Sequence, residues 1–343
     1  MSEGTTRRTF LQQAAGAATV AALAERVVSG TAEASSTGIP TRELGRTGER
    51  VSILCLGGWH TAAAADEAAS IRLVHTAIDE GVTFMDNAWE YHEGRAEEVM
   101  GQALAQDGCR HKAFLMTKNC ARDYEGSKKN LEDSLKRLQT DVIDLWQFHE
   151  IIYDIDPEWV FEKGAMKAAL EARQEGKIRY IGFTGHKDPR IHLDMLDKPF
   201  EWDTVQMPIN VADAHYRSFQ KQVVPVCLKR KIGVIGMKAL GGGGPGESVF
   251  TSRTDLTAAE CYRYALSLPV ASQVVGLTSL DQLKQAVAVA RGFEPMGDAE
   301  KQALLDKVAP EAGDGRHEMF KSGQAFDGAV HRGQHGFPER RRS

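Results

Sequence analysis

The sequence lacks the cysteine patterns that mark disulfide-rich proteins and many metal sites. Its five cysteines are odd in number and widely spaced, and no two of them form a C-x-x-C pair. We therefore expect neither a disulfide framework nor a zinc or iron–sulfur site, and we assign no residue to a metal. Cys55 lies inside an apolar run and is expected to be an inert core thiol.

A strongly basic surface and a long apolar run are missing as well. The chain has 42 lysines and arginines against 47 acidic residues, and no basic face stands out. Nucleic acid is therefore not an expected partner. The apolar run at residues 14–24 is too short and too rich in alanine for a stable membrane span.

The first 34 residues nevertheless contain an ordered set of signals. Arg7-Arg8 is followed by Phe10-Leu11, by the mild apolar run at 14–24, and by Ala32-Glu33-Ala34, a small-x-small cleavage site. This order resembles a bacterial twin-arginine export signal, which implies the export machinery as a partner and a periplasmic or other extracytoplasmic destination. The alternative is an amphipathic N-terminal helix with an incidental arginine pair. We set residues 1–34 apart from the fold.

The rest of the chain alternates between two kinds of periodicity, and its 42% hydrophobic content is ample for one large core. Strand-like runs lie near residues 51–56, 82–85, 113–117, 142–148, 178–182, 203–206, 232–236 and 273–276. Helical patterns lie between and after them, at 68–80, 97–106, 127–138, 158–174, 190–196, 219–229, 258–268 and 280–290. Eight such units predict an α/β fold, a (β/α)8 TIM barrel.

The barrel is expected to span residues 35–295, with an N-terminal hairpin at 42–51 and a C-terminal extension at 296–343. The end of that extension, residues 317–342, is rich in histidine, glycine and arginine and is expected to be loop-like. His111, His192 and His215 lack metal-ligand spacing and are expected to be structural or exposed.

Four polar side chains stand at or just after the ends of three successive predicted strands. Asp86 and Tyr91 follow one apolar run, Lys118 ends the next, and His149 follows the third. Taken singly, each has an ordinary structural explanation, such as a helix cap or a solvated charge. In parallel strands of one barrel they meet at the C-terminal rim, where barrel enzymes carry out their chemistry. Together they form a set of groups suited to proton transfer.

These segments carry a family resemblance. Asp86-x-Ala88-x-x-Tyr91, the run ending in Thr117-Lys118 and the run ending in Phe148-His149 resemble the catalytic tetrad of the aldo/keto reductase superfamily, over about residues 42–291. The resemblance implies that Tyr91 is the general acid or base. Lys118 would lower the pKa of Tyr91, and Asp86 would hold Lys118 in place. His149 would orient the carbonyl of a small aldehyde, ketone or alcohol substrate.

Hydride must come from a cofactor, because no side chain supplies it. The resemblance implies a nicotinamide site formed by Thr184, Gln206, Met237, Lys238, Leu240, Gly241, Gly276, Thr278 and Gln282. Three positions depart from the family pattern. Thr184-Gly185 replaces Ser-Asn, Met237 replaces a stacking aromatic, and no Arg or Lys follows the eighth strand until Lys284. We expect NADP or NAD, with NADPH slightly favoured.

The substrate pocket is expected to include Trp59, Trp89, Glu150, Tyr153 and the extension, although the aromatic residues would also suit a core. Lys238 would reach a phosphate or point to solvent, and glycines 241–244 would form either a lid or a plain loop. Two other functions stay open: a redox-neutral sugar enzyme with a tightly held cofactor, and a non-catalytic cofactor-binding sensor subunit.

Overall fold

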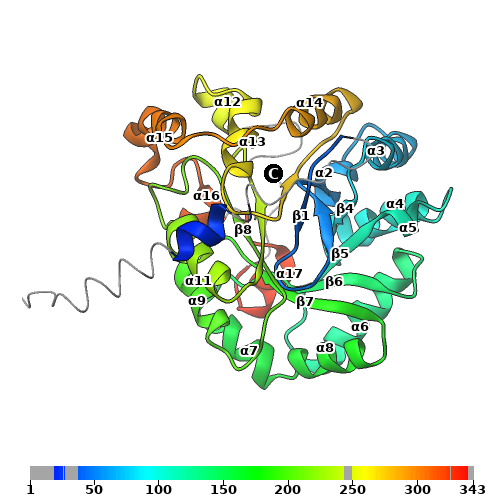
Figure 1. The fold of residues 1–343 in the computed structure, drawn as a ribbon. Coiled ribbons are helices and arrows are strands. Elements are labelled where there is room, and N and C mark those ends of the chain that lie inside the picture. Colours follow the sequence, from blue (N-terminus) through cyan, green and yellow to red (C-terminus); the bar gives the residue numbers. More distant parts are fainter. Residues whose placement is uncertain (1–18, 26, 28–37, 243–248, 325, 339–343) are drawn as a thin grey trace, which may run out of the picture.

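Eight parallel strands close into a barrel in a computed structural model that describes residues 19–25, 27, 38–242, 249–324 and 326–338 (Figure 1). Each strand pairs with the next in the chain, and the last returns to the first. The strands are β3 (Leu54–Gly57), β4 (Phe84–Asp86), β5 (Phe114–Asn119), β6 (Ile143–Phe148), β7 (Ile178–Thr184), β8 (Thr204–Pro208), β9 (Gly233–Met237) and β10 (Ser272–Val275). The predicted (β/α)8 TIM barrel is confirmed.

Helices surround the strands, and several of them begin at a short polar residue that caps the first turn (Figure 1). Asp66, Asp123, Asp188 and Ser279, for example, each accept a backbone N–H from the first turn of the helix that follows. The major barrel helices are α3 (Glu67–Asp79), α4 (Arg95–Leu104), α6 (Tyr124–Arg137), α7 (Asp156–Glu162), α8 (Ala165–Gln174), α9 (Pro189–Leu196), α11 (Val224–Lys229), α13 (Ala258–Leu266) and α14 (Leu280–Arg291). Shorter ones are α2 (Gly58–Thr61), η1 (Tyr91–Gly94), α5 (Cys109–Lys112), α10 (Phe219–Gln222) and α12 (Val249–Arg253).

Two of the helices predicted as single elements are each divided in two. The segment predicted at 158–174 breaks at Gly164, which has a φ of 96°, a left-handed conformation that favours glycine. The segment predicted at 219–229 restarts at α11, where Pro225 stands in the first turn and has no N–H to donate. Hydrophobic periodicity continues across both breaks, which explains why the pattern did not reveal them.

The predicted hairpin is present, but its second strand includes residues that were predicted to belong to the first barrel strand. β1 (Thr41–Glu43) pairs antiparallel with β2 (Arg50–Ser52), so the run predicted as one strand at 51–56 is shared between β2 and β3. The hairpin turn packs against the start of β9. A Cβ on Gly45 would lie 2.3 Å from the backbone nitrogen of Gly233, and Gly45 has a φ of 60°. The hairpin thereby covers the N-terminal end of the barrel.

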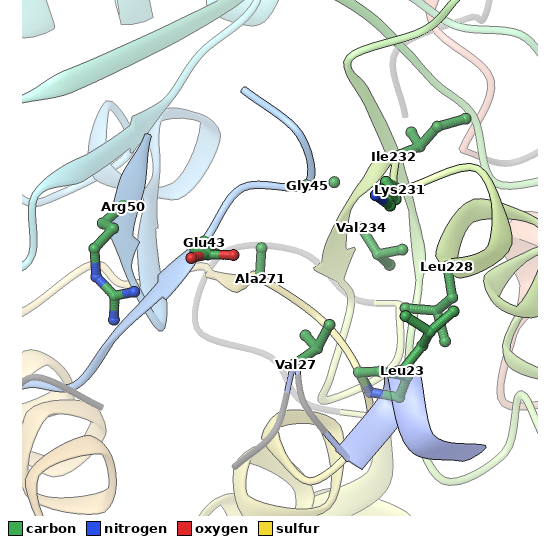
Figure 2. Close-up of a pocket in the computed structure, with 12 residues that line it drawn as sticks. Leu23, Val27, Glu43, Gly45, Arg50, Leu228, Lys231, Ile232, Val234 and Ala271 are labelled. Atoms are coloured by element: carbon green, nitrogen blue, oxygen red, sulfur yellow. The ribbon is translucent and has the colours of Figure 1, made fainter. Parts of the chain in front are cut away.

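Part of the N-terminal segment lies against that same end. Residues 19–25 are helical, and Leu23 and Val27 line a cavity of about 320 Å³ together with Leu228, Val234 and Ala271 (Figure 2). The arginine pair and the cleavage site lie outside the described residues. In the described ranges, every helix falls short of the length or the apolar character that a bilayer crossing requires.

The C-terminal extension differs from its prediction. Besides α15 (Asp298–Ala312), it contains α16 (Met319–Ser322) and α17 (Ala329–Gln334), so its last part is not simply loop-like. Phe320, Lys321 and His331 are buried. Leu23 and Val27 lie beside the hairpin and the start of β9, whereas α17 contacts Cys120 and Glu150 at the other end of the strands. A segment rich in glycine, histidine and arginine has no hydrophobic periodicity from which such burial could be predicted. Its buried side chains contact parts of the chain that are distant in sequence.

Candidate active site

The four predicted catalytic residues come together at the C-terminal rim. Lys118, in β5, forms a buried ion pair with Asp86, the last residue of β4. Its Nζ also donates to the carbonyl oxygen of Asn87 at 2.6 Å and lies 3.3 Å from the Tyr91 hydroxyl. Burial raises the pKa of Asp86, and the neighbouring Lys118 ammonium opposes that rise. The acid, amine and phenol thus form a continuous chain of polar contacts.

His149 completes the group from the end of β6. Its backbone N–H donates to the Asn119 carbonyl oxygen at 2.8 Å, and its ring stands edge-on to the Tyr91 ring with centroids 5.8 Å apart. Burial lowers the pKa of His149 to about 4, although nearby Glu90 and Glu150 oppose the shift. His149 is therefore a neutral imidazole near pH 7, with one nitrogen that donates and one that accepts.

The electrostatics of Tyr91 differ from the expectation. We predicted that Lys118 would lower the pKa of Tyr91, but burial and then the charges of Asp86, Glu150 and Glu90 raise it well above 10. The physical reason is that Asp86 offsets the positive charge of Lys118, while the carboxylates around the phenol disfavour a phenolate. Tyr91 is thus held as the protonated, proton-donating form.

A buried glutamate that the sequence analysis did not identify links the elements that carry these residues. Glu97, in α4, accepts hydrogen bonds from Thr117 at 2.6 Å, Ser134 at 2.7 Å and Arg137 at 3.2 Å. These donors come from β5 and α6, so the helix that follows Tyr91 is tied to the strand that carries Lys118. The sequence gives no local signal for this contact because the partners lie 20 to 40 residues away.

The predicted cofactor residues follow one another around the rim. Thr184 pairs with Gln206 across β7 and β8, and Pro208 pairs with Met237 across β8 and β9. Gln206 is buried and accepts from Gln147 at 3.2 Å. After β10, Gln282 accepts from the backbone and hydroxyl of Thr278, and a Cβ on Gly276 would lie 2.3 Å from the His60 ring. Leu240 and Gly241 follow β9, while residues 243–248 of the glycine-rich loop lie outside the described residues.

Lys238 turns inward rather than to solvent. Its Nζ lies over the rings of Phe320 and Phe326, 5.1 and 5.5 Å from their centroids. Burial lowers the pKa of Lys238. The C-terminal extension therefore covers the one basic side chain that we had considered as a phosphate contact.

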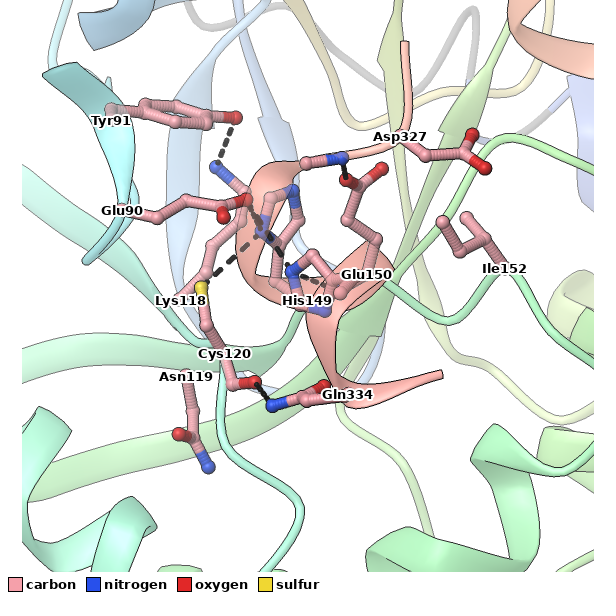
Figure 3. Close-up of polar contacts among 12 residues, drawn as sticks. Glu90, Tyr91, Lys118, Asn119, Cys120, His149, Glu150, Ile152, Asp327 and Gln334 are labelled. Carbon is pink, nitrogen blue, oxygen red and sulfur yellow. Dashed lines mark hydrogen bonds and ion pairs between the residues drawn. The ribbon is translucent and has the colours of Figure 1, made fainter. Parts of the chain in front are cut away.

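The end of the extension closes over the rim through polar contacts (Figure 3). Gly328 donates its N–H to the Glu150 carboxylate at 2.6 Å, and Tyr153 donates its hydroxyl to Asp327 at 2.8 Å. Gln334, in α17, donates to the Cys120 carbonyl oxygen at 2.8 Å. Glu150 and Tyr153 thus contact the extension, which forms a wall at the rim, and their place in a substrate pocket stays a prediction.

Of the two tryptophans predicted to line the pocket, one lies at the site and one points away. Trp59 is 41% exposed, and its ring is perpendicular to that of Tyr91 at 5.3 Å between centroids. Trp89 instead donates its indole N–H to Asp133 of α6 at 3.0 Å, and Arg137 lies over its ring. Trp89 is therefore an outer contact between the rim loop and α6, which corrects the prediction.

Comparison with known proteins assigns the chain to a family. A model of the aldo/keto reductase family matches residues 53–252, more than half of the sequence. The chain belongs to the aldo/keto reductase family. Such proteins are nicotinamide-dependent oxidoreductases, which agrees with the resemblance seen in the tetrad motifs.

Individual relatives share moderate identity. The aldo-keto reductase YhdN of Bacillus subtilis is 32% identical over 201 residues, which cover 54% of this chain and 57% of YhdN. The match to YhdN therefore spans less than two thirds of that relative. The L-galactose dehydrogenase of Arabidopsis thaliana is 26% identical over 319 residues, which cover 79% of this chain and 96% of that protein.

A solved structure shows the same fold. The holo form of the aldo-keto reductase AKR11C1 from Bacillus halodurans superposes with a TM-score of 0.64, over 78% of this chain and 96% of that one, at 24% identity. At this identity the likeness concerns the architecture of the barrel and leaves the substrate open.

Proposed function

We propose that this aldo/keto reductase reduces an aldehyde or ketone to an alcohol, or oxidises the alcohol, with Tyr91 as general acid or base. The observation that supports this most is the contact chain from Asp86 through Lys118 to the Tyr91 hydroxyl, with the neutral ring of His149 beside it. In the reductive direction, Tyr91 donates its proton to the carbonyl oxygen. Lys118, at 3.3 Å, then stabilises the phenolate, and His149 donates a hydrogen bond to the same oxygen.

The residues around the rim suit a nicotinamide dinucleotide. Thr184, Gln206 and Met237 would hold the nicotinamide, because they lie on three adjacent strands beside the tetrad. Gly276 lets the His60 ring pack where a Cβ would otherwise lie, and the first backbone N–H groups of α14 would face a phosphate. The cofactor supplies the hydride. The absence of a basic residue between β10 and Lys284 leaves NADPH only slightly favoured over NADH.

Tyr91→Phe tests the role of the phenol. We expect turnover of an aldehyde panel with NADPH or NADH to fall by about 10²–10⁴-fold, since the variant loses its proton donor. The affinity for the cofactor, measured by fluorescence titration, should change little. Tyr180→Phe is the matched control, because that hydroxyl bonds to Thr47 and Glu49 at the other end of the barrel. If Tyr91→Phe keeps most of its activity, Tyr91 is not the proton donor and the proposed mechanism is wrong.

A sugar is the substrate class that we favour. The name of the Arabidopsis relative, which matches over 96% of its length, refers to a hexose. Glu150 and Asp327 place carboxylates, and Tyr153 a phenol, in the wall formed with the extension. Enclosure by α17 also suits the redox-neutral alternative, in which one tightly held cofactor oxidises and then re-reduces a sugar.

The two reactions differ in whether the cofactor leaves. Protein purified without added nucleotide should be dialysed extensively, denatured, and its released nucleotide identified by absorbance and mass. Near-stoichiometric NADP or NAD after dialysis supports the redox-neutral reaction and also identifies the cofactor. Rapid loss of the cofactor contradicts internal recycling and leaves the conventional reductase.

We also propose that residues 1–34 direct export through the twin-arginine machinery to the periplasm or another extracytoplasmic compartment. The support is the order of the Arg7-Arg8 pair, the apolar run and the cleavage site in the sequence. In a bacterial host, the full chain should appear in the periplasmic fraction, shortened at its N-terminus. Replacing both arginines with lysine should retain it in the cytoplasm. Equal distribution of the two forms would contradict the proposal.

A further inference from the structure

Four side chains with metal-ligand chemistry meet where α17 folds onto the barrel rim. They are Glu90 from the loop after β4, Cys120 from the loop after β5, His149 from the end of β6, and His331 from α17 (Figure 3). One ligand atom from each lies within 4.8 Å of all the others. Cys120, His149 and His331 are buried, and the Glu90 side chain is only 11% exposed. The cluster is thus enclosed and draws on four separate segments of the chain.

Three of the distances within the cluster are compatible with ligands placed around a central ion. Glu90 Oε1 lies 3.3 Å from His149 Nδ1 and 3.4 Å from His331 Nε2, and Cys120 Sγ lies 3.6 Å from His149 Nδ1. Charge-assisted N–H···O bonds are shorter, about 2.7–2.9 Å. Ligand bonds of about 2.0–2.3 Å to a tetrahedral zinc ion place neighbouring ligand atoms about 3.3–3.7 Å apart. The three distances fall within that interval.

We propose that Glu90, Cys120, His149 and His331 bind one zinc ion, which fastens the C-terminal extension to the catalytic rim. Thiolate, imidazole and carboxylate are the groups that zinc binds in proteins, and the thiolate disfavours Mg²⁺ and Ca²⁺. Four protein ligands fill a tetrahedron and leave no position for substrate. The ion is therefore structural, and it joins His331 of α17 to three residues of the barrel.

Protonation of His331 is the main alternative to metal binding at this site. A protonated His331 would form an ion pair with Glu90, and the charge of Glu90 raises the pKa of His331 although burial lowers it. The Glu150 N–H also points at His331 Nε2, at 3.0 Å. An imidazole nitrogen has one lone pair, so a zinc ion bound to Nε2 would replace this hydrogen bond. The two arrangements differ in the presence of metal, which can be measured directly.

Zinc at this position would also affect His149. Coordination through Nδ1 leaves the proton on Nε2, so the ring has a fixed tautomer. This consequence rests on the proposed function, in which His149 donates a hydrogen bond to the carbonyl oxygen. The zinc site itself does not rest on it, because the ligands and their spacing are independent of any reaction.

The test begins with the metal content of the full chain, purified without chelators and measured by inductively coupled plasma mass spectrometry. We expect about one zinc per chain in the wild type, and a loss of most of it in Cys120→Ala and in His331→Ala. His335→Ala is the matched control. His335 follows α17 and holds it through Asp156 at 3.0 Å and by stacking on Trp159, but it lies outside the cluster. This variant should keep its zinc.

Exchange with Co²⁺ gives a second readout that needs no turnover. Wild type and His335→Ala should show a thiolate-to-cobalt absorption band, and Cys120→Ala should lack it while circular dichroism shows that it is folded. The proposal is overturned if the wild type contains no metal and takes up no Co²⁺, or if Cys120→Ala and His331→Ala retain the metal as well as the wild type. Active, metal-free protein overturns the zinc site alone. Metal-loaded protein without activity overturns the reductase alone.

Discussion

Two buried lysines in this protein have similar surroundings and different consequences. Lys118, in the barrel, binds the Asp86 carboxylate and the Asn87 carbonyl oxygen, and a phenol lies 3.3 Å away. Lys321, in α16, binds Asp213 at 2.6 Å, Glu318 at 2.8 Å and the Tyr216 carbonyl oxygen at 2.9 Å. Both side chains are almost fully buried, and each is paired with acidic partners.

The difference lies in what remains beside the ion pair. At Lys118, one carboxylate balances the ammonium and the third neighbour is the reactive Tyr91 hydroxyl. At Lys321, two carboxylates and a carbonyl oxygen occupy the ammonium, and its role is to hold α16 against the loop after β8. Burial and pairing alone therefore do not identify a catalytic lysine. A phenol within hydrogen-bond distance, at the mouth of the barrel, is what distinguishes Lys118.

Replacing each lysine with methionine should separate these roles and gives the largest effects. Lys118→Met should lower kcat by about 10²-fold or more, because Tyr91 loses the charge that stabilises its phenolate. Lys321→Met should instead lower the free energy of unfolding by about 3–5 kcal/mol, since two buried carboxylates lose their partner. Only one carboxylate is stranded in Lys118→Met, so its loss of stability should be the smaller.

The two quantities are measured separately, by steady-state kinetics at saturating cofactor and by urea unfolding followed with circular dichroism. Kinetics should be normalised to the folded fraction. The distinction between the lysines fails if folded Lys321→Met loses as much kcat as Lys118→Met. It also fails if Lys118→Met is fully active.

A smaller effect concerns the second carboxylate beside Lys321. Burial raises the pKa of Glu318 from 4.5 to about 7, although Lys321 opposes the rise. The folded protein therefore holds this proton more tightly than the unfolded chain. Stability from this group is present below pH 4.5 and declines as the pH rises to about 7, by about 3 kcal/mol in all. Above pH 7 the decline ends, because both states are ionised.

Glu318→Gln removes this titration and should flatten that part of the pH profile. Measured by urea unfolding between pH 4.5 and 8, the stability of the variant relative to the wild type should increase as the pH rises. Asp298→Asn is a control, because that exposed carboxylate lies in α15 and pairs only with Lys301 at the surface. A constant difference between Glu318→Gln and the wild type would show that Glu318 stays ionised throughout.

Much of the fold could be predicted from the sequence. Each barrel strand is a short apolar run bounded by polar residues, and each major helix has its own amphipathic pattern. The tetrad could be located because Asp86, Lys118 and His149 occupy equivalent strand ends, and parallel strands bring equivalent ends together. The breaks at Gly164 and Pro225 were missed because the hydrophobic pattern runs through them.

The walls of the site could not be predicted in the same way. Trp89 was expected in the substrate pocket, but its indole N–H donates to Asp133 on the outer side. The pKa of Tyr91 was expected to fall, because the carboxylates of Glu90 and Glu150 were not known to face it. Both errors concern the direction of side chains and the burial and charge around them, which spacing along the chain does not encode.

The sequence by itself determined the family, the barrel and the four residues on its rim, because strand patterns and short motifs depend on neighbours in the chain. Only the tertiary structure decided that the C-terminal extension folds back over the rim. It alone brought His331 to within 3.4 Å of Glu90 and Lys321 between two carboxylates. These contacts join segments separated by about 100 residues or more, or depend on the burial that such contacts create. Their energies arise from desolvation and charge pairing, which exist only after the chain has folded.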